Sequence, residues 1–270
     1  MNILNEFLDN IGGVYHVNDD AKTLFDICFE QNEEGKYDKT SFVENIFYST
    51  RMKNNVNLVM LDNVNMKYAP LMLKDFVSYS LNPSKDHIVS FSKRLRMKLP
   101  SNLIIVISPI NNNYLDMISD DFAEASIAID LSIRQIEPIK DKYEKEKTLS
   151  YSYLVDLVKE SKKSNFLSEE EWKKIDELEE ELIKTIKYKF NNKTILELER
   201  YSSVYIDCDG EPIDALATYL ANKIVPILKT HSIGKGENAK ENIYNLLEKY
   251  FKEDYLFLVK KVLQISSIED

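Results

Sequence analysis

Two short apolar runs, each ending in polar residues, constrain the fold of this chain more than any other feature. The first is residues 58–61, Leu-Val-Met-Leu, which Asp62 and Asn63 follow. The second is residues 103–107, Leu-Ile-Ile-Val-Ile, and it leads to Asn111. A continuous apolar run of this length is typical of a strand buried on both faces of a sheet. Because parallel strands bring their carboxyl ends to one edge of a sheet, we expect Asp62 and Asn111 to share that edge.

Helical and β-prone patterns alternate with these two runs. The spacing of apolar residues predicts helices at 2–11, 41–52 and 69–80, a short strand at 14–17, and a third apolar strand at 127–131. The stretch from residue 18 to Gly35 is polar, and we predict no element there. Helices and strands in alternation argue for an α/β fold with a mostly parallel sheet.

After about residue 135 the strand signals nearly vanish. A capping box, with Ser168 as N-cap and Glu171 three residues on, precedes a long amphipathic pattern at 168–190. Together with a helical stretch around 138–163, it predicts an antiparallel helical hairpin. Three more apolar helical faces are predicted at 213–227, 243–250 and 256–263. Pro226 should kink or end the first of them, because proline lacks the amide hydrogen.

These patterns predict three parts: an α/β core at 1–135, a helical hairpin at 136–200 and a compact helical subdomain at 201–270. The composition supports a globular chain, because 44% of its 270 residues are hydrophobic and only six are glycine. No apolar stretch approaches the roughly 20 residues that a membrane span needs, and the first residues lack a signal-peptide pattern. We therefore expect a cytoplasmic protein with no membrane partner.

The net charge of −10 makes nucleic acid an unfavourable partner unless a local basic patch meets it. The clearest patch is Lys93, Arg94, Arg96 and Lys98, which we interpret as a solvated surface.

Cysteine and histidine give no pattern that carries chemistry. Cys28 and Cys208 lie far apart and have neither disulfide nor metal spacing. His16, His87 and His231 are scattered, with no carboxylate or cysteine at ligand spacing, so we interpret them as structural.

The order of these elements resembles an AAA+ ATPase module, in particular the McrB-like branch of modified-cytosine restriction GTPases. Residues 37–43 followed by 57–65 are similar to the approach to the Walker B strand in that family. Residues 108–111, Ser-Pro-Ile-Asn, are similar to its sensor 1, and 214–226, which end in Val-Pro, resemble its lid helix. The resemblance implies a P-loop-type sheet with a helical lid at 201–270.

Phosphoryl transfer in this family needs a glycine-rich phosphate loop, an acidic metal-holding residue, a group that orients water and an arginine. By resemblance, Asp62 corresponds to the metal-holding Asp and is the candidate metal ligand, and Asn111 corresponds to the sensor 1 amide. Asn63 stands at the position of the catalytic Glu, and an amide cannot accept a proton from water. Residues 120–127 contain no arginine, and Gly234-Lys235-Gly236 lacks P-loop spacing, so we interpret it as a loop between helices.

In the family, the phosphate loop would precede the helix at 2–11, and its strand would lie between 103–108 and 127–131. We therefore expect a sheet that lacks this first strand. Three outcomes stay open: the two edges close on each other, a partner or second copy supplies the strand, or the chain is a fragment.

The functional expectation is a non-catalytic, AAA+-derived protein that acts through protein contacts or self-association and needs no cofactor, with Asp62, Asn63 and Asn111 as vestigial site positions. The resemblance alone implies a bacterial defence or restriction-type setting. The alternative is a fragment of an ATPase or GTPase that uses Mg²⁺ at Asp62. A third reading is a helical adaptor with an incidental α/β half.

Overall fold

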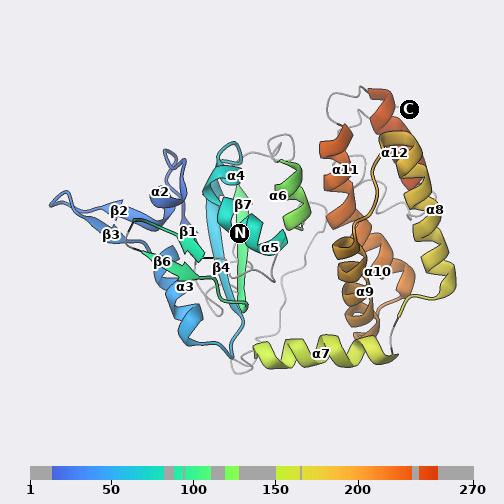
Figure 1. Cartoon of the computed structure of the whole chain (residues 1–270), viewed down its shortest axis with the longest axis horizontal. Coiled ribbons are helices and arrows are strands. Elements are labelled where there is room, and N and C mark those ends of the chain that lie inside the picture. Colours follow the sequence, from blue (N-terminus) through green and yellow to red (C-terminus); the bar gives the residue numbers. More distant parts are fainter. Residues whose placement is uncertain are drawn as a thin grey trace, which may run out of the picture. The chain divides into compact units, whose positions relative to one another are not determined.

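The computed structural model describes residues 14–81, 88–93, 95–110, 119–127, 150–164, 166–232 and 237–248. The chain divides into two compact units (Figure 1). Met1–Ala125 and Ile136–Leu154 form the first, called the α/β unit below. Ser126–Gln135 and Val155–Asp270 form the second, called the helical unit. The α/β class is confirmed, whereas the boundaries expected at 135 and 200 stay predictions.

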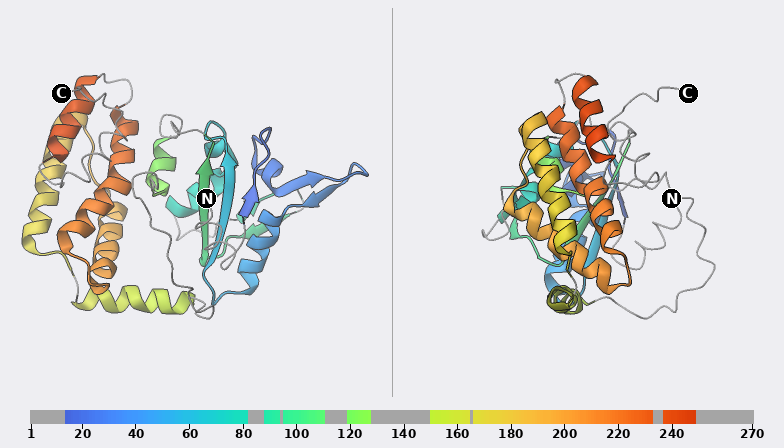
Figure 2. Two further views of the ribbon diagram at one scale, coloured as in Figure 1. Left: turned by 180° about the vertical axis from the view of Figure 1, so that it is seen from behind. Right: turned by 90° about the vertical axis from the view of Figure 1, so that its right-hand side faces the viewer.

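A three-stranded parallel sheet forms the centre of the α/β unit. Its strands are β1 (Val14–His16), β4 (Asn57–Val64) and β7 (Leu103–Pro109), in the order β1-β4-β7. Both apolar runs are therefore neighbouring parallel strands, as expected, and Figure 2 shows β4 and β7 side by side. The middle strand, β4, buries Val59, Met60 and Leu61 in succession; because successive side chains of a strand point to opposite faces, both faces of the sheet are covered at these residues.

Helices complete the core around this sheet. They are α3 (Ser41–Arg51), α4 (Ala69–Met72), α5 (Lys74–Leu81) and α6 (Asp120–Ala125). Phe42 and Ile46 of α3 are fully buried, which accounts for the helical spacing in the sequence. The expected helix at 69–80 is present but divided between α4 and α5, since α4 ends at Leu73. The helix that we expected at 41–52 is confirmed.

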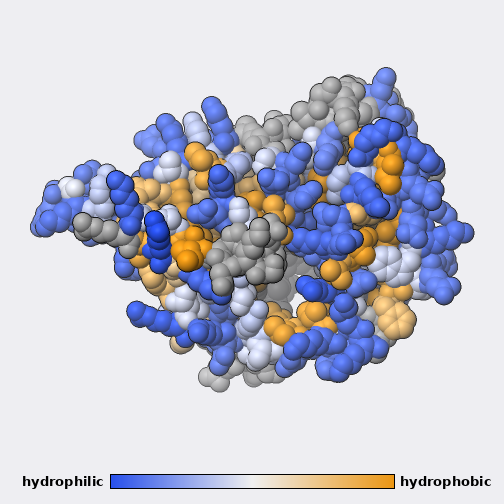
Figure 3. Space-filling view, viewed as in Figure 1, coloured by the Kyte–Doolittle hydropathy of each residue, from blue (hydrophilic) through white to orange (hydrophobic). Residues whose placement is uncertain are grey.

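The polar stretch in which we predicted no element holds a helix and a strand. Helix α2 (Leu24–Cys28) has a capping box formed by Thr23 and Asp26. Strands β2 (Phe29–Gln31) and β3 (Tyr37–Lys39) then form an antiparallel hairpin. The hairpin projects from the α/β unit in Figure 1, and Figure 3 shows its end as mostly hydrophilic. Three-residue strands are too short for alternation to reveal them in a sequence.

A second hairpin was also missed. It consists of β5 (Ile88–Ser90) and β6 (Arg96–Lys98), and it packs Val89 and Met97 against the core. Arg96 and Lys98 alternate with Met97 and are exposed. The basic patch is thus the solvent face of a hairpin, although Arg94 lies outside the described residues.

The helical unit contains the rest of the described helices: α7 (Tyr151–Ser164, whose residues from Val155 on belong here), α8 (Glu169–Ile186), α9 (Asn192–Asp207), α10 (Pro212–Tyr219), the π-helix η2 (Leu220–Ile224), α11 (Val225–Ser232) and α12 (Glu237–Leu247). The capping box at the start of α8 is confirmed: the Ser168 hydroxyl accepts from the Glu171 amide, and the Glu171 carboxylate accepts from the Ser168 amide. Helix α9 had not been predicted.

The break expected at Pro226 takes the form of a π-helix. The helical path runs through α10, changes to η2 at Leu220–Ile224 and returns to α-helix one residue before Pro226. A π-helical turn is wider than an α-helical turn and pairs each amide with a different carbonyl oxygen. It therefore accommodates a proline, which has no amide hydrogen to donate. The turn also buries Lys223, whose Nζ donates to the Ser126 carbonyl oxygen at 2.9 Å.

Several predictions fall outside the described residues. They are the helices at 2–11 and 256–263, the first part of the helix at 138–163, residues 128–131 of the third strand, the loop at 234–236 and Asn111. Ile127 is described and belongs to neither helix nor strand. Among the described residues, no helix is long and apolar enough to cross a membrane.

Candidate functional site

The candidate site is the carboxyl edge of β1 and β4, where the structure brings Asp62 beside His16. The two residues are direct partners in the parallel register, and His16 Nδ1 lies 3.3 Å from Asp62 Oδ2. The His16 side chain is 69% exposed and that of Asp62 is 28% exposed, so the pair adds little stability. This contact was not predicted. The signal for it is that β1 and β4 are adjacent parallel strands, so that their last residues lie at the same edge of the sheet.

Asn63 has a structural role in the same edge. Its φ of 63° is left-handed, and the β4–β7 register shifts between Leu61 and Val64 around it. Asparagine tolerates this conformation better than most residues because its side chain bonds to nearby backbone. The Asn63 amide nitrogen donates to the Val17 carbonyl oxygen at 3.1 Å and to Asp19 Oδ1 at 2.7 Å. Asn63 therefore ties the bulge in β4 to the loop after β1.

The backbone reinforces this tie. The Val17 amide donates to the Asp62 carbonyl oxygen at 2.9 Å, which extends the β1–β4 pairing beyond His16. The segment Asp62–Asn63 is thus bound to the β1 side of the edge through both backbone and side chains. The polar tip of β4 was expected to be part of a vestigial nucleotide site, and the structure gives the side chains of Asp62 and Asn63 partners within the chain.

The loops at this edge also carry positive charge. Lys22 Nζ lies 5.8 Å and Lys67 Nζ 5.6 Å from the centre of the Tyr68 ring, close enough for cation–π attraction. The edge therefore presents both signs of charge within a few residues of Asp62. This contact was not predicted, because the two lysines come from loops that are distant in the sequence.

Metal binding at Asp62 is not supported by a cluster of ligands. Among the described residues, no group of three or more His, Cys, Asp or Glu side chains is arranged to hold a metal ion. Asn111, the other residue expected at this edge, lies outside the described part of the chain. The expectation that it meets Asp62 stays a prediction.

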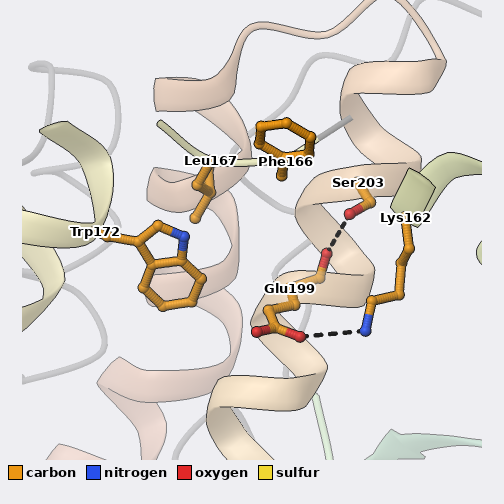
Figure 4. Close-up of a pocket in the computed structure, with 6 residues that line it drawn as sticks. All are labelled: Lys162, Phe166, Leu167, Trp172, Glu199 and Ser203. Carbon is orange, nitrogen blue, oxygen red and sulfur yellow. Dashed lines mark hydrogen bonds and ion pairs between the residues drawn. The ribbon is translucent and has the colours of Figure 1, made fainter. Parts of the chain in front are cut away.

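A second feature is a small open pocket in the helical unit, drawn in Figure 4. It has a volume of about 200 Å³. Its lining comes from α7, the start of α8, α9 and the segment between α7 and α8: Lys162, Phe166, Leu167, Trp172, Glu199 and Ser203. Phe166 is 68% exposed, and Lys162 Nζ lies 3.2 Å from Glu199 Oε2.

The pocket suits a side chain of a partner better than a nucleotide. Ligand sites for small molecules usually have volumes of roughly 300–1,000 Å³. The Ser203 hydroxyl donates to the Glu199 carbonyl oxygen at 2.7 Å, so that hydroxyl is already engaged. A second pocket, of about 120 Å³, lies between α4, α5 and α6 in the α/β unit.

One of the two cysteines is a core residue. Burial strongly raises the pKa of the Cys28 thiol, so this side chain is an inert core group rather than a nucleophile. Cys208 is exposed and free. The His231 ring lies 4.9 Å from the ring of Tyr188 in the helical unit.

Comparison of the chain with protein-family models, with curated proteins and with solved structures gives no match.

Proposed function

We propose that this chain is a non-hydrolytic protein of AAA+ ancestry that acts through protein–protein contacts. The observation that carries the proposal is the engagement of Asn63. The Asn63 side-chain nitrogen donates hydrogen bonds to the Val17 carbonyl oxygen and to Asp19 Oδ1, and the left-handed backbone at Asn63 fixes the direction of this side chain. A side-chain amide held in this way orients strand β4. It has no basic atom that could accept a proton from an attacking water.

Two observations support the ancestry. Adjacent parallel strands each end in the residues that resemble Walker B and sensor 1, and their order, β1-β4-β7, is compatible with a P-loop-like sheet. A helical unit follows the sheet in the chain, as a lid does in the family. The lid assignment for 201–270 and the defence or restriction setting are implied by the resemblance alone.

One observation favours the competing proposal of a nucleotide hydrolase. Asp62 stands at the carboxyl end of the central strand, where a P-loop enzyme places its metal-holding carboxylate, and it keeps 28% of its side chain exposed. Phosphate release from ATP and GTP, measured with Mg²⁺, separates the two. We expect no release above buffer from the wild-type chain.

Two variants make the assay decisive. Asn63→Glu restores the carboxylate of the family, and Asp62→Asn removes the candidate metal ligand. Our proposal expects all three proteins to be inactive. Phosphate release by the wild type that Asp62→Asn abolishes, or activity that Asn63→Glu creates, would overturn it and favour the hydrolase.

A further inference from the structure

A group of aromatic rings lies where helix α2 meets the hairpin β2–β3: Phe25 belongs to α2, and Phe29 and Tyr37 belong to the two strands. The Phe25 and Phe29 rings stack at 4.8 Å, and the Phe25 and Tyr37 rings meet edge to face at 5.2 Å. Phe29 packs partly against the core, but Phe25 is 36% exposed and Tyr37 is 58% exposed. Clustered rings on a projection are typical of an interaction surface, because aromatic side chains supply contact area at low entropic cost.

The same hairpin is acidic. Glu30 and Asp38 are direct cross-strand partners, and two carboxylates in this arrangement repel each other. Asn32 Nδ2 donates to Asp38 Oδ2 at 3.0 Å, which relieves only part of the repulsion. None of the ion pairs between described residues includes Glu30 or Asp38. A cation placed between the two carboxylates would stabilise the hairpin.

The hairpin β5–β6 offers the complementary chemistry. Its outer face carries Ile88, which is 63% exposed and is the cross-strand partner of Lys98, and Arg96, which is the partner of Ser90; Lys93 lies at the turn. Residues 88–100 contain no Asp or Glu. Arginine pairs with carboxylates and also stacks on aromatic rings, so Arg96 matches both features of β2–β3.

We propose that β2–β3 of one copy docks against β5–β6 of a second copy of this chain. Arg96 of the second copy lies between Glu30 and Asp38, and Ile88 packs against Tyr37. A second copy is the occupant because one chain carries both complementary surfaces. The inference rests on the proposed function in protein contacts and adds the partner to it. The two surfaces differ, so they meet either reciprocally in a two-fold dimer or head to tail in a ring or filament.

Charge reversal tests this docking by sedimentation equilibrium and light scattering. The wild-type chain is expected to exceed its monomer mass of 31.5 kDa in a concentration-dependent way at 50 mM salt, and to dissociate at 500 mM. Glu30→Lys with Asp38→Lys replaces the two docking carboxylates with basic side chains, and Lys93→Glu with Arg96→Glu replaces two of the four basic side chains of residues 88–100 with carboxylates. Each double variant alone should associate at least tenfold more weakly.

A mixture of the two double variants decides the question. It pairs opposite charges at both hairpins, so it should regain association in a one-to-one complex. The matched control is Asp176→Lys with Glu180→Lys, which reverses two exposed carboxylates on α8 and should associate like the wild type. Circular dichroism verifies that every variant is folded.

Three results would overturn the docking: a wild type that stays monomeric up to 100 μM at 50 mM salt, a mixture that stays monomeric while both variants are folded, or a control that dissociates equally. The phosphate-release assay is independent of these outcomes. A chain that is monomeric and does not hydrolyse nucleotide contradicts the docking and leaves the proposed function standing. A chain that associates and hydrolyses nucleotide contradicts the proposed function and leaves the docking standing.

Discussion

The structure allows an estimate of how much stability the chain loses when Asn63 is replaced. Asn63→Ala removes the bonds to the Val17 carbonyl oxygen at 3.1 Å and to Asp19 Oδ1 at 2.7 Å. Each is worth about 0.5–1.5 kcal/mol in a partly buried place. Alanine also lacks the local bond that favours a φ of 63°, and a left-handed residue without it costs about 1 kcal/mol. The sum is a loss of about 2–4 kcal/mol.

Two further variants separate the hydrogen bonds from the backbone. Asn63→Gly loses the same bonds but adopts the left-handed conformation freely, so it should recover about 1 kcal/mol relative to Asn63→Ala. Asn63→Asp keeps the shape but places a carboxylate against Asp19, so its deficit should be largest at neutral pH and shrink as the pH falls below about 4.

Urea unfolding followed by circular dichroism measures these differences. All variants should share the wild-type dependence on urea, because the unfolded surface is unchanged. An Asn63→Ala chain within 0.5 kcal/mol of wild type, or an Asn63→Gly chain less stable than Asn63→Ala, would refute the structural role of Asn63.

Three other predictions concern the core and the helical unit. Hydrogen bonds from Ser168 to Glu171 hold the pKa of that carboxyl below its ordinary value, so its stabilisation is complete above pH 4.5 and is lost as pH falls through the folded-state pKa. Ser168→Ala should cost about 1 kcal/mol at pH 7 and flatten this acid dependence in melting curves; an unchanged dependence would contradict the capping box. Tyr219→Phe removes a buried bond to the Thr194 carbonyl oxygen at 3.0 Å and should lose about 1–2 kcal/mol by urea unfolding, and no loss would disprove that bond. Phe42→Ala empties a fully buried position and should lose about 3–5 kcal/mol in the same assay, and a loss under 1 kcal/mol would place Phe42 outside the core.

The elements that could be predicted from the sequence are those with a long periodic signal. The runs at 58–61 and 103–107 became the strands β4 and β7. Val59, Met60 and Leu61 of β4 are buried in succession, whereas β7 is mostly half-buried and its Ile104 is 46% exposed, so the burial expected on both faces holds for β4 and not for β7. The capping box at Ser168 was recognised because its partners are three residues apart and local geometry alone forms it.

The features that were missed are either too short to leave a periodic pattern or depend on contacts distant in the chain. The β2–β3 turn is closed by Asn32, whose side-chain oxygen accepts from the Lys36 amide at 2.9 Å, and by Gly35 at a φ of 75°. The three-residue strands on either side give no periodic pattern. The His16–Asp62 contact spans 46 residues and exists only because β1 pairs with β4.

The identity of the site residues was partly predictable. Their location at the end of β4 followed from the apolar run, whereas the role of Asn63 did not, because a left-handed φ and a bond to Asp19 are invisible in a sequence. The structure supplied the role of Asn63, which joins β4 to the loop after β1.

We propose that the polar end of β4 holds the sheet edge together and does not bind nucleotide. Isothermal titration calorimetry of the wild-type chain with ATP and with GTP, each in the presence of Mg²⁺, separates these two roles. We expect no saturable heat with either nucleotide at up to millimolar concentration. Saturable binding in the micromolar range that disappears in Asp62→Asn would contradict it.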